Sequence, residues 1–249
     1  MKRRWLAVGA LLLTGLLLYL VWGARPLHMQ KVAAIGVEVP MALPIQGIDI
    51  SRYQGHIDWD SLSNARFAGM RVHFVFLKAT EGTDMEDPSF AENWKQARAH
   101  GLVRGAYHYF YSTRDPLLQA RRFIRQVQLQ PGDLPPVLDI EITNDRPDSQ
   151  IRRTALIWLN AVQQAYGVTP ILYTNPKFYL RHLGPAFSKY PLWISHYQLL
   201  EGPGLPRWTF WQYSDSARLP GIQGRVDMDA FSGDSLEFRT LRILQDSSL

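Results

Sequence analysis

The segment that most constrains the fold is residues 136–142, Pro-Val-Leu-Asp-Ile-Glu-Ile, which carries two carboxylic acids in an otherwise apolar run. It follows a Pro-Gly-Asp-Leu-Pro breaker, and its composition predicts a strand buried on both faces. Because side chains alternate along a strand, Asp139 and Glu141 should point to the same side. Buried charges must find partners or shift their pKa. The pair is therefore either two salt-bridged acids at a strand end or two carboxyl groups that catalyse glycoside hydrolysis.

Short apolar runs of this kind alternate with helical patterns from residue 45 onward. Strands are expected at 46–51, 72–80, 103–110, 137–142, 170–174, 192–197, 209–213 and 225–229. Helices are expected at 59–67, 88–100, 116–129, 148–166 and 176–183. The segments between the last three strands are too short for full helices. The pattern predicts an α/β fold, an irregular TIM-like β/α barrel in which helices are missing between the last strands.

The N-terminal region differs in composition from the rest of the chain. Residues 5–24 contain no charged side chain and could form a helix of about 30 Å, enough to cross a bilayer. Lys2, Arg3 and Arg4 precede this run, and Val21-Trp-Gly is a poor cleavage site. We therefore expect a transmembrane signal-anchor at 1–24, a linker at 25–44 and the barrel at 45–249. This arrangement would anchor the chain in the inner (cytoplasmic) membrane with its catalytic domain on the periplasmic or extracytoplasmic side; secretion after cleavage is the alternative.

Charge and cysteine content exclude several classes of partner. The net charge is +5, but residues 1–25 hold four of the 27 cations and none of the 22 acids. The remaining chain has 23 cations against 22 acids, so its charge does not favour nucleic acid. There are no cysteines, and therefore neither disulfides nor cysteine-ligated metals. His108 has no second ligand at metal-binding spacing and is expected to be structural, so no metal or cofactor is expected.

Polar side chains recur where the predicted strands end, which in a β/α barrel is the end that carries the chemistry. Strands one and eight adjoin when a barrel closes, so Asp49 and Asp227 should approach each other. Lys78 is expected to form an ion pair with the acids. Trp193 and Tyr173 are expected to bind sugar rings rather than to fill the core. The candidate substrate-binding residues are Tyr53, Lys78, Tyr107, Tyr173, Trp193 and Gln212.

Seven short motifs in order resemble those of family 25 glycoside hydrolases, the muramidases of the Chalaropsis type. The resemblance covers about residues 45–233. In this sequence the motifs read Gly47-Ile-Asp-Ile-Ser with Tyr53-Gln-Gly, Phe76-Leu-Lys-Ala-Thr-Glu-Gly, Gly105-Ala-Tyr-His-Tyr-Phe, Asp139-Ile-Glu, Leu172-Tyr-Thr, Trp211-Gln-Tyr and Val226-Asp. Two positions depart from the family pattern: Ser195 stands where alanine is usual, and Asp229 where asparagine is frequent.

The resemblance implies an irregular β/α barrel that cleaves the β-1,4 bond between N-acetylmuramic acid and N-acetylglucosamine in peptidoglycan. Glu141 matches the general acid of the family, and Asp139, Asp49 and Asp227 match its other active-site acids. Asp139 either attacks the anomeric carbon or assists the 2-acetamido group of the substrate. A non-catalytic glycan-binding or envelope docking barrel is the alternative. Chitin hydrolysis is disfavoured, because the chain lacks the Asp-x-x-Asp-x-Asp-x-Glu run of chitinases.

Overall fold

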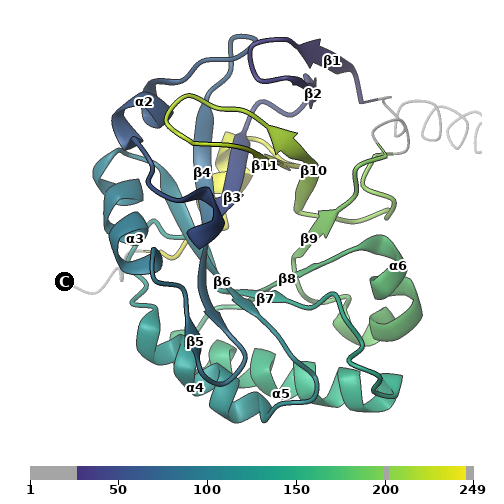
Figure 1. Ribbon diagram of the computed structural model, residues 1–249. Coiled ribbons are helices and arrows are strands. Elements are labelled where there is room, and N and C mark those ends of the chain that lie inside the picture. Colours follow the sequence, from purple (N-terminus) through teal and green to yellow (C-terminus); the bar gives the residue numbers. More distant parts are fainter. Residues whose placement is uncertain (1–26, 199–201, 245–249) are drawn as a thin grey trace, which may run out of the picture.

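The computed structural model describes residues 27–198 and 202–244 and shows a closed eight-stranded barrel surrounded by helices (Figure 1). In order around the barrel, the strands are β3 (Gln46–Ile50), β4 (Val72–Glu81), β6 (Val103–Tyr109), β7 (Val137–Asp139), β8 (Ile171–Thr174), β9 (Leu192–Ser195), β10 (Phe210–Ala217) and β11 (Val226–Phe231). Pairing of β3 with both β4 and β11 closes the ring. The short β5 (Met85–Glu86) extends β4 outside it. The predicted α/β barrel is confirmed at this level.

The eighth strand departs from a regular β/α barrel. In the ring, every neighbouring pair from β3 through β10 is parallel, whereas β11 runs antiparallel to both β10 and β3. A short connection joins β10 to β11, and such a connection can only link antiparallel strands. As a result the start of β11, not its end, lies at the carboxyl end of the other strands.

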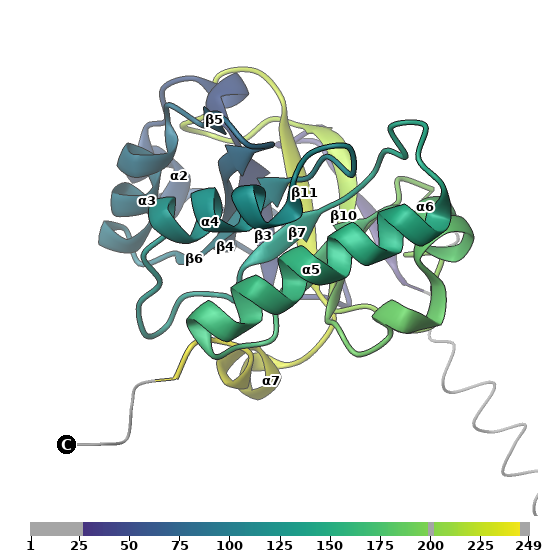
Figure 2. The ribbon, with the colours of Figure 1, turned by 90° about the horizontal axis from the view of Figure 1, so that it is seen from below.

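Helices cover most of the outer surface of the sheet, as Figure 2 shows. They are α2 (Trp59–Asn64), α3 (Phe90–Ala99), α4 (Pro116–Gln126), α5 (Asp148–Tyr166) and α6 (Pro176–Phe178), which continues into a π-helical turn (Tyr179–Leu183) and a 3₁₀ turn (Gly184–Phe187). A 3₁₀ turn (Arg52–Gln54) follows β3, and α7 (Ser235–Thr240) follows β11. Helix α4 begins as its sequence predicts, because the Asp115 side chain accepts hydrogen bonds from the first free backbone N–H groups.

A β-hairpin occupies most of the interval 25–44 that the sequence predicted to be a linker. Strands β1 (Met29–Val32) and β2 (Val37–Pro40) pair antiparallel and lie near β10 and β11 in Figure 1. Val32, Ile35 and Val39 are buried in the main core, and the Ile35 carbonyl accepts a hydrogen bond from the Arg218 backbone N–H. The linker prediction is wrong from Leu27 onward. The apolar residues of this segment show no sustained period in the sequence, yet they cover the side of the barrel that lacks helices.

The membrane prediction concerns residues outside the described part of the chain. The segment 1–24 is not described, and within 27–198 and 202–244 no helix combines the length and apolar content that crossing a bilayer requires.

The lower half of the barrel interior is filled by aromatic side chains. Phe74 and Phe76 of β4 point inward, while Val75 and Leu77, which alternate with them, pack outward against the helices. We call six rings of this interior cluster the aromatic floor: Phe74, Phe76, Trp193, Phe210, Phe231 and Phe238. Phe238 comes from α7 rather than from a strand of the barrel.

Two glycines make room for the aromatic floor. A Cβ on Gly47 would lie 2.2 Å from the Phe74 ring, and one on Gly105 would lie 2.5 Å from the Phe76 ring. Both rings are fully buried, so neither can move away without disturbing its neighbours. These positions on β3 and β6 therefore require glycine for packing reasons.

Gly47→Ala should lower the thermal unfolding temperature by several degrees, because overpacking a core costs about 1–3 kcal/mol. Calorimetry on the single variants and the double variant with Phe74→Leu tests the cause. The smaller side chain should absorb part of the clash, so the two losses should not add. Strictly additive losses would contradict the packing argument.

Candidate active site

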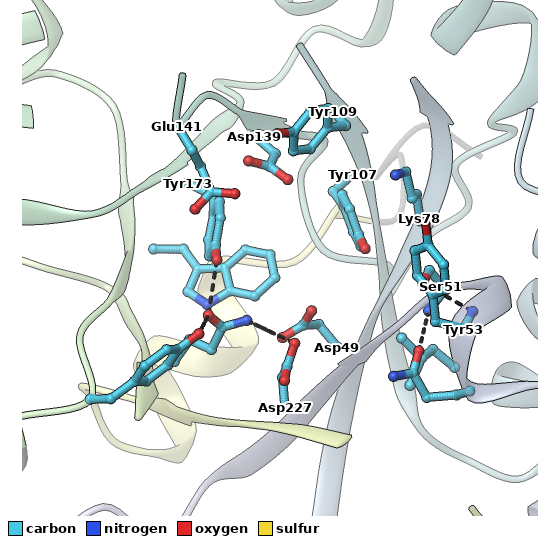
Figure 3. A pocket seen from close by; sticks show the side chains of 15 residues that line it. Asp49, Ser51, Tyr53, Lys78, Tyr107, Tyr109, Asp139, Glu141, Tyr173 and Asp227 are labelled. Carbon is cyan, nitrogen blue, oxygen red and sulfur yellow. Dashed lines mark hydrogen bonds between the residues drawn. The ribbon is translucent and has the colours of Figure 1, made fainter. Parts of the chain in front are cut away.

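A cavity of about 310 Å³ opens above the aromatic floor (Figure 3). All ten residues that the sequence predicted for the site line it: Asp49, Tyr53, Lys78, Tyr107, Asp139, Glu141, Tyr173, Trp193, Gln212 and Asp227. It is also lined by Ile50, Ser51, Gln54, Tyr109 and Tyr197. The tertiary structure thus brings together side chains from all eight strands of the barrel and from the loops that follow them.

The period of two along each strand explains this convergence. On three strands, the inward-facing residue two positions beyond the level of the floor is polar: Gly47 is followed by Asp49, Phe76 by Lys78, and Phe210 by Gln212. On the antiparallel β11 the order is reversed, and the polar Asp227 precedes Phe231, the floor residue of that strand. One layer of the barrel is therefore apolar, and the layer above it carries the polar groups.

Asp139 and Glu141 form the first acid pair, on one wall of the cavity in Figure 3. Strand β7 ends at Asp139, three residues earlier than predicted, because its neighbours pair with only three of its residues. The Ile140 backbone still bonds to the Tyr173 carbonyl at 3.0 Å, which holds the following residue at the mouth. Asp139 is 5% exposed, whereas Glu141 is half-buried.

Burial dominates the protonation of this pair. Desolvation raises the pKa of Asp139 well above its ordinary value, and the negative charge of Glu141 raises it further. Desolvation also raises the pKa of Glu141. One Asp139 carboxylate oxygen is buried without a hydrogen-bond partner among the described residues. Two adjacent carboxyl groups with raised pKa values favour a state in which the pair holds a proton at moderately acidic pH.

Asp49 and Asp227 form the second acid pair, opposite the first. They are direct partners in the β3–β11 register, as their predicted approach required. Desolvation, followed by the charge of Asp227, raises the pKa of Asp49 well above its ordinary value. Desolvation, followed by the charge of Asp215, raises the pKa of Asp227 to about 6.

Gln212 connects the second acid pair to two tyrosines. Its side-chain N–H donates to Asp49 at 2.6 Å, and its carbonyl oxygen accepts from the Tyr173 and Tyr197 hydroxyls at 2.9 and 2.8 Å. Tyr197 was not among the predicted site residues. On the predicted sixth strand, Trp193, Ser195 and Tyr197 are every second residue, so their side chains are expected on the same face. Tyr109 was also missed, and its alternation with Tyr107 on β6 was the available signal.

The structure differs from the sequence prediction in the depth of Trp193 and in the ion-pair partner of Lys78. Trp193 is 2% exposed, its ring stacks on Phe76 with centroids 4.3 Å apart, and its indole N–H donates to Asp229 at 2.7 Å. It is therefore part of the aromatic floor rather than a platform at the rim. Lys78 forms its ion pair with Glu81 and not with the four acids of the cavity.

The remaining predicted residues differ in exposure. Tyr53 is 76% exposed at the rim, whereas Tyr107 and Tyr173 stand inside the cavity, and Tyr173 is 7% exposed. His108 is fully buried against Trp158, with Thr80 and Gln119 as polar partners. Burial lowers the pKa of His108 to about 3, so the ring is neutral. Within 27–198 and 202–244 no group of three or more potential metal ligands is present.

Comparison with known proteins agrees with this geometry. The chain is 39% identical over 214 residues to protein YegX of Escherichia coli (strain K12), covering 85% of this chain and 76% of YegX. It is 32% identical over 217 residues to Lysozyme M1 of Streptomyces globisporus, covering 79% and 71% of the two chains.

Among solved structures, a family 25 glycosyl hydrolase from Bacillus anthracis superposes with a TM-score of 0.72 and 30% identity. The match covers 80% of this chain and 94% of that structure. Residues 48–222 match the sequence pattern of the family described as glycosyl hydrolases family 25. That match spans most of the barrel and includes Asp49, Asp139 and Glu141, whereas Asp227 lies beyond it. The relatives and the fold agree with the match, so the chain belongs to glycosyl hydrolase family 25.

Proposed function

We propose that this chain is a muramidase that hydrolyses the β-1,4 bond between N-acetylmuramic acid and N-acetylglucosamine in peptidoglycan. The observation that carries the proposal is the desolvated Asp139–Glu141 pair at the carboxyl end of the barrel strands. The similarity to Lysozyme M1 supports the choice of bond. A docking barrel would gain nothing from four desolvated carboxyl groups, which cost folding free energy.

Glu141 is assigned as the general acid. It lies at the mouth, where a glycosidic oxygen can reach it, and desolvation helps it to hold a proton. Protonation of the leaving oxygen breaks the bond as positive charge develops on the sugar ring. Asp139 lies deeper, where its negative charge stabilises that developing positive charge and orients the 2-acetamido group, whose oxygen attacks the anomeric carbon. Water then attacks the same carbon and breaks the bond to the acetamido oxygen, while Glu141, which has given up its proton, accepts a proton from the water. Direct attack by Asp139 is disfavoured, because only 5% of this residue is exposed.

Asp49, Asp227 and Gln212 are assigned to substrate binding, together with the cavity tyrosines. Two acids that share a proton can both donate and accept hydrogen bonds, which suits the hydroxyl and acetamido groups of a sugar. Gln212 fixes the orientation of Asp49 before substrate arrives. Binding in this preorganised site costs less entropy than binding to mobile groups.

Glu141→Gln should reduce turnover of peptidoglycan roughly 10²–10⁴-fold, because the leaving oxygen then lacks its proton donor. It should cost far less on an aryl glycoside with an activated leaving group. Asp139→Asn should slow both substrates, because it impairs the charged transition state whatever group leaves. Steady-state rates of both folded variants on both substrates test the assignment. Near-normal peptidoglycan turnover by Glu141→Gln would show that the acid lies elsewhere among Asp49, Asp139 and Asp227.

The second acid pair should make stability depend on pH. The folded-state pKa of Asp227 is raised to about 6 from 3.8, so its neutral form favours folding. This contribution is complete below about pH 4 and is lost as pH rises through about 6. The unfolding temperature should therefore fall by a few degrees between pH 5 and pH 8, measured by calorimetry.

Asp227→Asn should flatten that dependence and raise the unfolding temperature at pH 8, while reducing activity. The exposed Asp84→Asn is the matched control, since its carboxylate forms a surface ion pair with Arg114. If the unfolding temperature of Asp227→Asn falls with pH as steeply as that of the wild type, the pH dependence does not come from Asp227.

We further propose that the chain acts on the outer side of the cytoplasmic membrane, held there by residues 1–24. The charge-free run and the cations before it support this orientation. N-terminal sequencing of protein recovered from membranes should find an intact Met1 or Lys2 start. A soluble product that begins between residues 23 and 31 would indicate secretion after cleavage.

A further inference from the structure

A second groove, of about 550 Å³, adjoins the catalytic cavity and shares Glu141 with it. One wall is the loop that follows β7, and the other is the helical segment that follows β8, beside the start of α5 (Figure 2). The residues that line it are Glu141, Ile142, Thr143, Asn144, Asp145, Asn175, Lys177, Phe178, Arg181 and His182. We call it the side groove.

Two cations in the side groove have no acidic partner among the residues that the structure describes. Lys177 and Arg181 are both exposed and lie four residues apart on the same helical segment, a spacing at which like charges repel. Within 27–198 and 202–244, neither has a carboxylate at ion-pair distance. His182, in contrast, pairs with Asp148 at 2.7 Å. The acids that line the groove are Glu141 and Asp145.

Both walls of the groove have unusual backbone geometry. Asn144 and Asp145 take positive φ angles of 50° and 56°, which cost free energy in residues with a side chain. Ser112, itself buried, stabilises this loop: its N–H donates to the Asn144 side chain at 3.2 Å, and its hydroxyl donates to the Thr143 carbonyl at 3.0 Å. Arg181 lies on a π-helical turn, a geometry frequent at functional sites.

We infer that the side groove binds the peptide stems of the peptidoglycan strand, with Lys177 and Arg181 pairing with stem carboxylates. The inference rests on the muramidase function proposed above. A strand whose cleaved bond lies at Glu141 passes directly beside this groove, and its muramic acid residues carry peptides with free carboxylates. A guanidinium can hold a carboxylate with two parallel hydrogen bonds, and an ammonium adds a second positive charge.

The test compares glycan strands that carry their stems with the same strands stripped of stems by an amidase. The full-length chain in detergent is assayed for new reducing ends. Lys177→Gln/Arg181→Gln should lower kcat/KM on stem-bearing strands roughly three- to tenfold, mainly through KM, as expected for two partly exposed ion pairs. Activity on stripped strands should not change, and added salt should weaken the wild-type preference for stems.

Lys95→Gln/Arg121→Gln is the matched control, because it removes two exposed cations from α3 and α4. It should behave as wild type on both polymers. Equal losses of the groove variant on both polymers, or losses no larger than those of the control, would overturn the inference while leaving the muramidase assignment intact. If the wild type cleaves neither polymer, the proposed function fails and the inference with it.

Discussion

The structure depends on the division of the barrel interior into an aromatic lower layer and a polar upper layer. The packed floor closes the lower end of the cavity, and burial of the acids above it raises their pKa values. The floor is tightly packed because Gly47 and Gly105 leave room for the rings of Phe74 and Phe76. Packing below and protonation above are thus two consequences of one arrangement.

The two acid pairs differ in what surrounds them, and this difference suits different roles. Asp139 and Glu141 are arranged by depth, one buried and one at the mouth, as a proton donor and its helper require. Asp49 and Asp227 are paired in register on the adjacent strands β3 and β11, and the Gln212 side-chain amide donates hydrogen bonds to both. Gln212 also accepts hydrogen bonds from the hydroxyls of Tyr173 and Tyr197, which connects the second acid pair to the wall that carries Tyr173. These side chains are therefore held in place before substrate binds.

The antiparallel β11 explains how the barrel differs from a regular one without losing its site. Reversing this strand leaves no room for a crossover helix, and the hairpin of β1 and β2 lies near that side with Val32 and Val39 in the core. Reversal also places Asp227, near the beginning of β11, at the same end as the carboxyl ends of the other strands. On the opposite side, the loop after β7 and the segment after β8 extend the site into the side groove.

The sequence was enough to predict the barrel, its eight strands and ten of the fifteen residues that line the cavity. Strands buried on both faces are short apolar runs, and the polar residues at their carboxyl ends form the site of a β/α barrel. Both features can be seen in a few consecutive residues of the sequence. Local pattern could not predict the direction of β11, the depth of Trp193 or the partner of Lys78, because each depends on neighbours distant in sequence. The hairpin at 29–40 was missed for the same reason: its apolar residues have no period of their own and are buried by β10 and the chain around Arg218. Tertiary packing decides such positions, since burial is a property of the assembled barrel and not of any one segment.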